Sequence, residues 1–151
     1  MAAGRISGTI HWRGVVLGGL IAGVSINAVQ IAFHWVSAGG NWWFFRALTD
    51  PIARAPAIVR YAGLHFITGV TAVWLYAAAR PRYGPGPKTA VRVGLAYWVI
   101  GYALPTIGFY PLLVPEIRGP MWLTASVVEL VGITLATLSG AWLYSERQPG
   151  A

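Results

Sequence analysis

The chain has 151 residues, of which 56% are hydrophobic and only 10% are charged, with a mean hydropathy of +0.60. This composition is too apolar for a soluble domain of that length and indicates a membrane protein. The net charge of +7 does not indicate nucleic-acid binding, because the cations stand singly or in short clusters between apolar runs. The absence of cysteine excludes disulfides, thiolate metal sites and iron–sulfur clusters.

Apolar runs of about the length needed to cross a hydrocarbon core of ~30 Å occur four times. They cover roughly Gly14–Val36, Ala57–Ala79, Ala90–Val114 and Met121–Tyr144. The runs are continuous rather than alternating, which favours helices over a barrel. We therefore predict an all-α membrane protein in which residues 1–151 form one domain, an antiparallel bundle of four transmembrane helices. The lipid bilayer is its first predicted partner.

Between the first two runs lies the one sizeable loop, residues 37–56. Its segment "GGNWWFFRALTDP" contains four consecutive aromatic residues, followed by Arg46 and a Thr49/Asp50 pair suited to capping. The pattern predicts a short helix lying in the outer membrane interface. A surface on which a partner docks is the alternative.

The second and third runs are joined by "ARPRYGPGPK", which carries four cations in or beside it: Arg80, Arg82, Lys88 and Arg92. Alternating helices place seven cations on this side of the membrane and four on the other. Positive residues favour the cytoplasm, so we predict that both termini and this connection face the cytoplasm. Pro81, Pro85 and Pro87 are expected to stop the helices and make a tight turn, with its cations near anionic headgroups.

The ends of the second and fourth runs are similar in sequence. "AVWLYAAARP" at Ala72–Pro81 is matched by "GAWLYSERQP" at Gly140–Pro149, and the preceding helices begin with "RGVVLGGLIAG" from Arg13 and "RVGLAYWVIG" from Arg92. Two repeated helical hairpins would explain the match. The alternative is that helices leaving the membrane share an interfacial preference for Trp, Tyr and Arg. In either case Trp74 and Tyr76 are predicted to belong to the aromatic belt.

Polar residues within the apolar runs are the candidates for a site, because each is unfavourable in lipid. They gather on single helix faces, and the residues singled out are Asn27, Gln30, His34, Arg60, His65 and Glu129. Asn27, His65 and Glu129, on the first, second and fourth runs, lie about 12–14 Å below the predicted outer helix ends and are expected to meet. A proton-linked or ligand-binding site around Glu129 with His65 is one hypothesis. A buried network that only fixes helix register is the other.

Other chemistries find little support in the sequence. A haem held by His34 and His65 is disfavoured, because the two residues differ in predicted depth by roughly 9 Å. No metal, catalytic or phosphate-binding motif is present, so no cofactor is predicted and the sequence does not argue for an enzyme.

The stretch "WLYAAARPRYGPGPKTAVRVGL", together with the closing "GAWLYSE", resembles a group of small bacterial integral membrane proteins of about this length. The resemblance implies a four-helix inner-membrane protein and supplies no activity. The leading hypothesis for function is an accessory or structural subunit, acting as a homo-oligomer or within a larger membrane complex. The alternative is a small transporter or ligand-binding protein that uses Asn27, His65 and Glu129.

Overall fold

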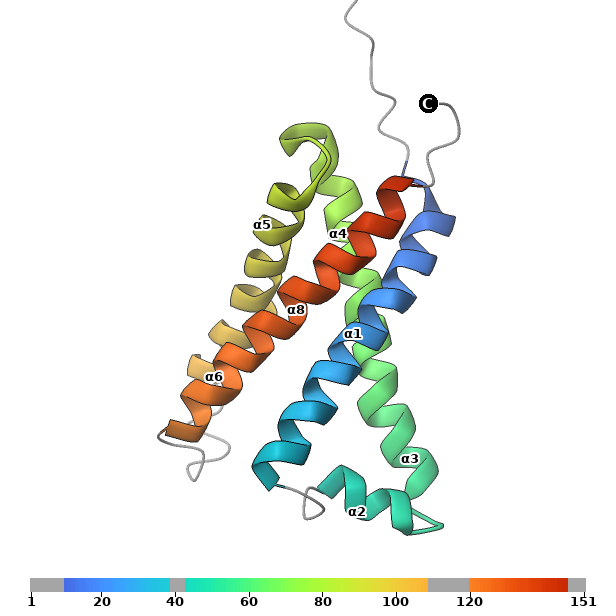
Figure 1. The fold of residues 1–151 in the computed structure, drawn as a ribbon, viewed down its shortest axis with the longest axis vertical. Helices are drawn as coiled ribbons and strands as arrows, with labels where there is room; N and C mark the ends of the chain where they lie inside the picture. The colour runs from blue at the N-terminus through green and yellow to red at the C-terminus, as the bar shows by residue number, and fades with distance from the viewer. Residues whose placement is uncertain (1–9, 39–42, 109–119, 147–151) are drawn as a thin grey trace, which may run out of the picture.

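The computed structural model describes residues 10–38, 43–108 and 120–146, and within them every regular element is helical (Figure 1). Four segments are long and apolar enough to cross a membrane: Trp12–Ser37, Arg54–Tyr83, Pro87–Gly108 and Leu123–Tyr144. The predicted four-helix membrane bundle is therefore confirmed as the fold class. The predicted outer end of the third run, residues 109–114, lies outside the described residues.

Two of the spans are single helices, α1 (Trp12–Ala38) and α8 (Pro120–Glu146). The other two are composite. The second joins α3 (Arg54–Ile58), the π-helical turn η2 (Val59–Gly63) and α4 (Leu64–Tyr83). The third joins α5 (Pro87–Trp98), the π-helical turn η3 (Val99–Ala103) and α6 (Leu104–Gly108). Pro105 is the second residue of α6, two positions after the end of η3, and a π-helical turn is one way to accommodate a ring that removes a backbone hydrogen bond.

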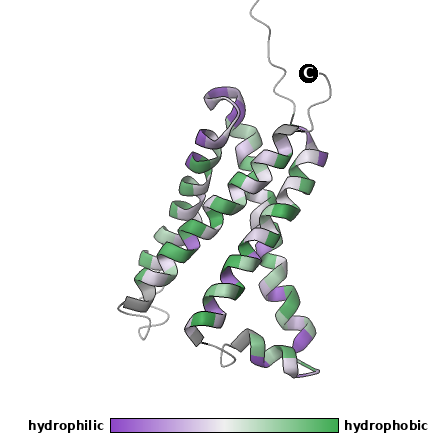
Figure 2. Cartoon of the chain, viewed as in Figure 1, coloured by the Kyte–Doolittle hydropathy of each residue, from purple (hydrophilic) through white to green (hydrophobic). Residues whose placement is uncertain are grey.

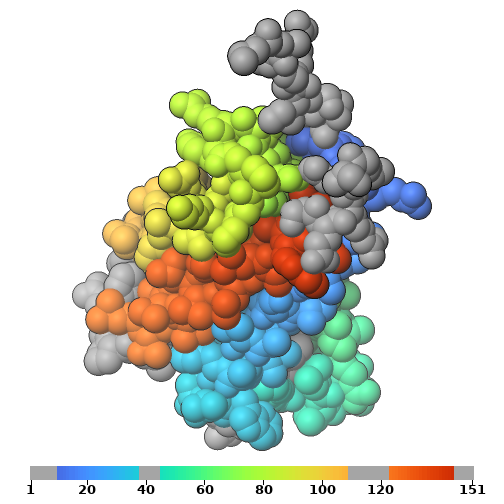
Figure 3. Space-filling model, turned by 45° about the horizontal axis from the view of Figure 1, so that its top comes forward, coloured from blue at the N-terminus to red at the C-terminus, as the bar shows by residue number. Residues whose placement is uncertain are grey.

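Successive spans run antiparallel, so that α1 begins and α8 ends beside the α4–α5 turn (Figure 1). The most extensive packing joins α1 to α8 and to α4, and α5 packs mainly on α8. Figure 3 shows α8 in orange lying between α5 and α1 on one face of the molecule. Large apolar side chains remain exposed along all four spans, as expected for helices that contact lipid.

Glycines bring the backbones of α1, α4 and α8 into direct contact. A Cβ added at Gly18 would lie 2.6 Å from the carbonyl oxygen of Gly140, and one added at Gly19 would lie 2.4 Å from the Cα of Val70. A Cβ at Gly69 would lie 2.4 Å from the Gly19 oxygen. Small residues permit this close approach. Helices gain no hydrophobic driving force by associating in lipid, so close van der Waals packing stabilises their association instead.

The segment between the first two spans contains α2 (Trp43–Thr49), a short helix where one was predicted. After it, the carboxylate of Asp50 accepts hydrogen bonds from the backbone N–H groups of Ile52 and Ala53, at 2.8 and 3.2 Å. The Arg54 guanidinium donates to the carbonyl of Leu48 at 2.8 Å. These bonds turn the chain from α2 into the second span; the interfacial position of α2 stays a prediction.

The α4–α5 turn differs from the prediction at Pro81, which lies inside the last turn of α4. Its fixed φ suits a helix, and so near the helix end it interrupts little of the hydrogen-bond ladder. The reversal itself uses Gly84 and Gly86, whose φ angles of 81° and 114° are strained for any L side chain. Hydrophilic residues gather at this turn, and apolar residues dominate the spans below it (Figure 2).

The Tyr76 side chain is 0% exposed, so it does not face the headgroup region as predicted for a belt residue. Trp74 is exposed, and its place in the belt stays a prediction. The Tyr76 hydroxyl accepts a hydrogen bond from the Gly86 N–H at 3.0 Å, and the Tyr76 ring meets that of Tyr144 edge-on at 6.1 Å. The Arg80 guanidinium lies over both rings, 5.9 and 5.2 Å from their centroids. The two Trp-Leu-Tyr segments therefore meet at this end of the bundle through their tyrosines.

We expect Tyr76→Phe to lower the free energy of unfolding by about 1 kcal/mol, because the Gly86 N–H loses its acceptor while the ring packing is kept. Tyr83→Phe is the matched control, since that side chain is 53% exposed. Unfolding by SDS in mild detergent, followed by circular dichroism, measures both. Equal stability of Tyr76→Phe and the control would show that the hydrogen bond does not hold the turn.

Candidate polar site between α1, α4 and α8

The first polar contact joins α1 to α4. His65 Nδ1 lies 3.0 Å from Asn27 Oδ1, and the Asn27 amide nitrogen donates to the carbonyl of Gly23 at 2.9 Å. The bond to Gly23 orients the amide, so its oxygen faces the ring and His65 Nδ1 is the donor. The glycine packing of α1 on α4 lies directly inward of this pair and places the two helices close enough for it.

A second polar contact joins α1 to α8. The Gln30 side-chain amide donates a hydrogen bond to the Glu129 carboxylate. Glu129 lies three and seven residues before Gly132 and Ala136, which are both buried, so the carboxylate shares their face. Glu129 therefore faces the bundle and bonds to a polar group of the first span. Whether it serves a function stays a prediction.

The pairing differs from the hypothesis in which Glu129 and His65 are partners. In the structure each bonds to an amide of α1, and the two amides are three residues apart on one helical face. Asn and Gln side chains offer both a donor and an acceptor, so α1 can satisfy an acid on one neighbour and an imidazole on the other. Helix α1 is thus the common partner of both contacts.

Asn27, His65, Gln30 and Glu129 together form a polar cluster. The remaining predicted residues lie at its edge. His34 is half-buried one turn outward from Gln30, with its ring 5.1 Å from that of Phe33. Arg60 lies in η2 with its side chain exposed, so it does not line the buried contacts. Tyr61, beside it, packs edge-on against His65 with ring centroids 4.5 Å apart. Tyr61 is thus a packing partner of His65 that was not among the predicted site residues.

Two serine features were not anticipated. Ser25 Oγ and Ser139 Oγ lie 3.1 Å apart across α1 and α8. Ser126 is 7% exposed, and its hydroxyl has no hydrogen-bond partner within the described parts of the chain, although its carbonyl accepts from the Trp98 indole at 3.1 Å. Serine is compatible with both packing and polar contact in a helix interface, so its presence alone gave no signal.

The arrangement can hold a carboxyl and an imidazole between helices in hydrogen-bonded form, and it can carry a proton on either group. Residues 10–38, 43–108 and 120–146 contain no group of three or more His, Asp or Glu side chains placed to hold a metal ion. The haem hypothesis gains no observation in its favour. The chemistry of the cluster is therefore that of paired polar groups within a membrane span.

The fold and the cluster define a four-span α-helical membrane protein. Comparisons with known protein families, with curated proteins and with solved structures found no match. The resemblance carried by the Trp-Leu-Tyr and Gly-Pro-Gly-Pro segments thus stays a prediction.

Proposed function

We propose that this protein is a small accessory or structural subunit of the membrane, which acts by association rather than by conducting a substrate through its own bundle. The observation that carries the proposal is the direct backbone contact of α1 with α4 and α8 through Gly18, Gly19, Gly69 and Gly140. Helices that touch at their backbones leave no room between them for a permeation path.

The polar contacts are consistent with this role. Asn27 with His65 and Gln30 with Glu129 are satisfied by each other, so they specify how α1 docks on α4 and α8. Polar pairs in membrane helices commonly fix partner and register in this way. The exposed apolar faces remain free to contact lipid, a second copy or another membrane protein.

The test is the size of the particle extracted by a mild detergent from cells that express the tagged protein at its native level. We expect a homo-oligomer or a larger complex that contains the chain in fixed stoichiometry. A monomer with no stoichiometric companion, both in detergent and after cross-linking in intact membranes, would contradict the proposal.

A transporter or ligand-binding function is the second candidate, and one observation favours it. Glu129 is a carboxylate within a membrane span, and such residues mark proton or substrate sites more often than residues of other types. This candidate requires that the cluster be reached from the outer side. Substitutions of Glu129 distinguish it from the first candidate, as described below.

We further propose that both termini and the α4–α5 turn face the cytoplasm, in the inner membrane of a bacterium. Neutralising Arg80, Arg82, Lys88 and Arg92 together should weaken this orientation, because three cations would then remain on that side against four on the other. Reporter fusions at the C-terminus measure the orientation before and after the change. An external C-terminus in the native chain would refute the assignment.

A further inference from the structure

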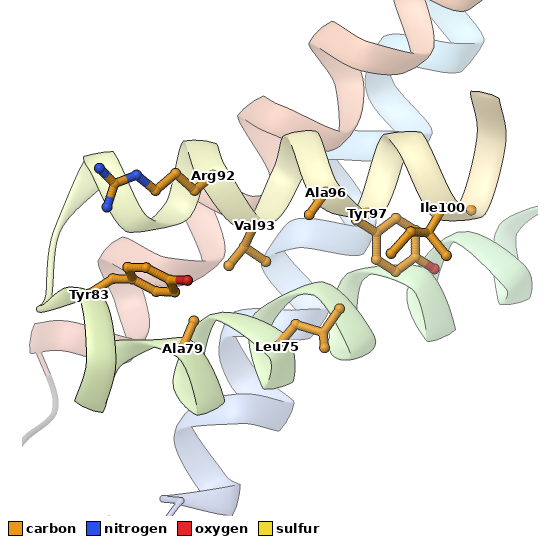
Figure 4. Close-up of a pocket in the computed structure, with 9 residues that line it drawn as sticks. Leu75, Ala79, Tyr83, Arg92, Val93, Ala96, Tyr97 and Ile100 are labelled. Carbon is orange, nitrogen blue, oxygen red and sulfur yellow. The ribbon is translucent and has the colours of Figure 1, made fainter. Parts of the chain in front are cut away.

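A groove of about 770 Å³ lies between α4 and α5 (Figure 4). Its volume falls within the range of ~300–1,000 Å³ that is typical of ligand pockets. The α4 wall presents Leu75, Ala79 and Tyr83, and the α5 wall includes Val93 and Tyr97. Apart from one guanidinium and two phenol hydroxyls, the side chains that line the groove are apolar.

The groove exists because α5 packs less closely on α4 than α1 packs on α8. Aligning Arg13 with Arg92 places Tyr97 at the position of Gly18 and Val93 at the position of Gly14. Gly18 lets α1 touch the backbone of α8, whereas the side chains of Tyr97 and Val93 project toward α4 and keep the helices apart (Figure 4). The α1–α8 interface is thus closed, whereas the α4–α5 interface, its counterpart in the predicted repeat, is open.

Positive charge is concentrated at one end of the groove. The Arg92 guanidinium lies 5.4 Å from the centroid of the Tyr83 ring, and that of Arg82 lies 5.8 Å from the same ring. Among the described residues that line the groove, none is acidic. This end adjoins the α4–α5 turn, which lies at the membrane surface.

The length of the groove matches one leaflet of a bilayer. From Arg92 to Gly101 along the helix is about 13 Å at 1.5 Å per residue, and half of a hydrocarbon core of ~30 Å is about 15 Å. An occupant must therefore be apolar over roughly one leaflet and anionic at the membrane surface. A membrane lipid with a phosphate headgroup has this chemistry.

We propose that the α4–α5 groove binds one acyl chain of an anionic glycerophospholipid from the leaflet at the α4–α5 turn, with the lipid phosphate on Arg92 and Arg82. Basic pockets between transmembrane helices bind such headgroups. A helix from another protein fits less well, because its apolar face would cover the two guanidinium groups without supplying a negative charge.

The experiment uses the full chain in mild detergent, to which phosphatidylglycerol or phosphatidylcholine is added, with retained lipid counted by native mass spectrometry. We expect one phosphatidylglycerol to be retained in preference to phosphatidylcholine. Arg92→Gln should weaken that retention roughly fivefold, the factor for losing one cation's attraction at a membrane surface. Arg13→Gln, an exposed cation at the same end of the bundle, is the matched control and should change little.

Filling the groove tests the acyl chain separately from the headgroup. Ala79→Phe places a ring in the groove and should abolish retention, whereas Ala78→Phe, on an exposed part of α4 outside the lining, should not. Equal losses in Arg92→Gln and Arg13→Gln would overturn the proposal, as would full retention in Ala79→Phe. Loss of a dimer rather than of lipid in Ala79→Phe would assign the groove to a second copy instead. Glycerol 3-phosphate, which has no chains, should not be retained.

Discussion

Gly69→Ala is expected to lower the free energy of unfolding by about 3 kcal/mol, the upper part of the range for overpacking. The new Cβ would lie 2.4 Å from the Gly19 oxygen and 2.5 Å from the Gly23 nitrogen. Both are backbone atoms, so no side-chain rotation relieves the contact, and α1 must move away from α4. The movement should also lengthen the Asn27 to His65 contact on the same pair of helices. SDS unfolding of the purified protein measures the loss.

The control for this substitution is Gly63→Ala, at a helical glycine of the same span. A Cβ there would meet no atom within 4 Å. Alanine has the higher helix propensity, so Gly63→Ala should leave the stability unchanged or raise it slightly. If the two variants were equally stable, α1 and α4 would not pack as closely as the structure has them.

Glu129→Ala is expected to destabilise the protein by about 1 kcal/mol, because the Gln30 amide loses its acceptor in a half-buried position. Glu129→Gln should be almost neutral, since its amide oxygen can still accept from Gln30. A double-mutant cycle with Gln30→Ala should give a coupling of about 0.6 kcal/mol, as is usual for hydrogen bonds between membrane helices. SDS unfolding of the four variants provides the numbers.

The same substitution separates the two candidate functions. Glu129→Gln keeps the shape and the hydrogen bond but removes titration of the carboxyl group, so an accessory subunit should assemble normally with it. A protein that couples transport or binding to a proton should lose that activity. Normal stability with lost activity would therefore favour the second candidate. If both Glu129→Gln and Glu129→Ala left stability, assembly and any measured transport unchanged, neither role would belong to this cluster.

The four spans and the polar face of α1 follow from the sequence because they depend on local patterns. Hydropathy locates helices that must satisfy their backbone within lipid, and the four-residue and three-residue spacings from Gly23 through Asn27 to Gln30 identify one face. The partners of that face are not local. The sequence alone allowed Glu129 to pair with His65 as well as with the amides of α1. The relative rotation of the three helices decides between these pairings. That rotation depends on glycine contacts such as Gly18 with Gly140.

The end of the bundle at the α4–α5 turn shows that residue type alone does not determine exposure. Tyr76 and Trp74 have the same interfacial preference, yet only the tryptophan is exposed. A tyrosine hydroxyl can be buried when a partner is available, and the Gly86 N–H provides one through the geometry of the turn. Pro81 differs for a similar reason, because its effect depends on how near the helix end it lies. The α4–α5 groove could not be predicted from the sequence, because it depends on how the two hairpins pack together.

Thiol labelling tests most directly whether the bundle excludes water from the polar contacts around Glu129, since the chain contains no cysteine to be removed first. Single variants Ile52→Cys and Pro85→Cys place a thiol on the exposed outer segment and on the exposed α4–α5 turn, and each should react with a membrane-impermeant maleimide from one side only. Ser126→Cys lies three residues outward from Glu129 at a buried position. The account predicts that this thiol is protected from both sides in intact membranes. Reaction of Ser126→Cys from the outer side at a rate comparable to that of Ile52→Cys would reveal a water-filled path to the polar cluster and contradict a bundle that works only by association.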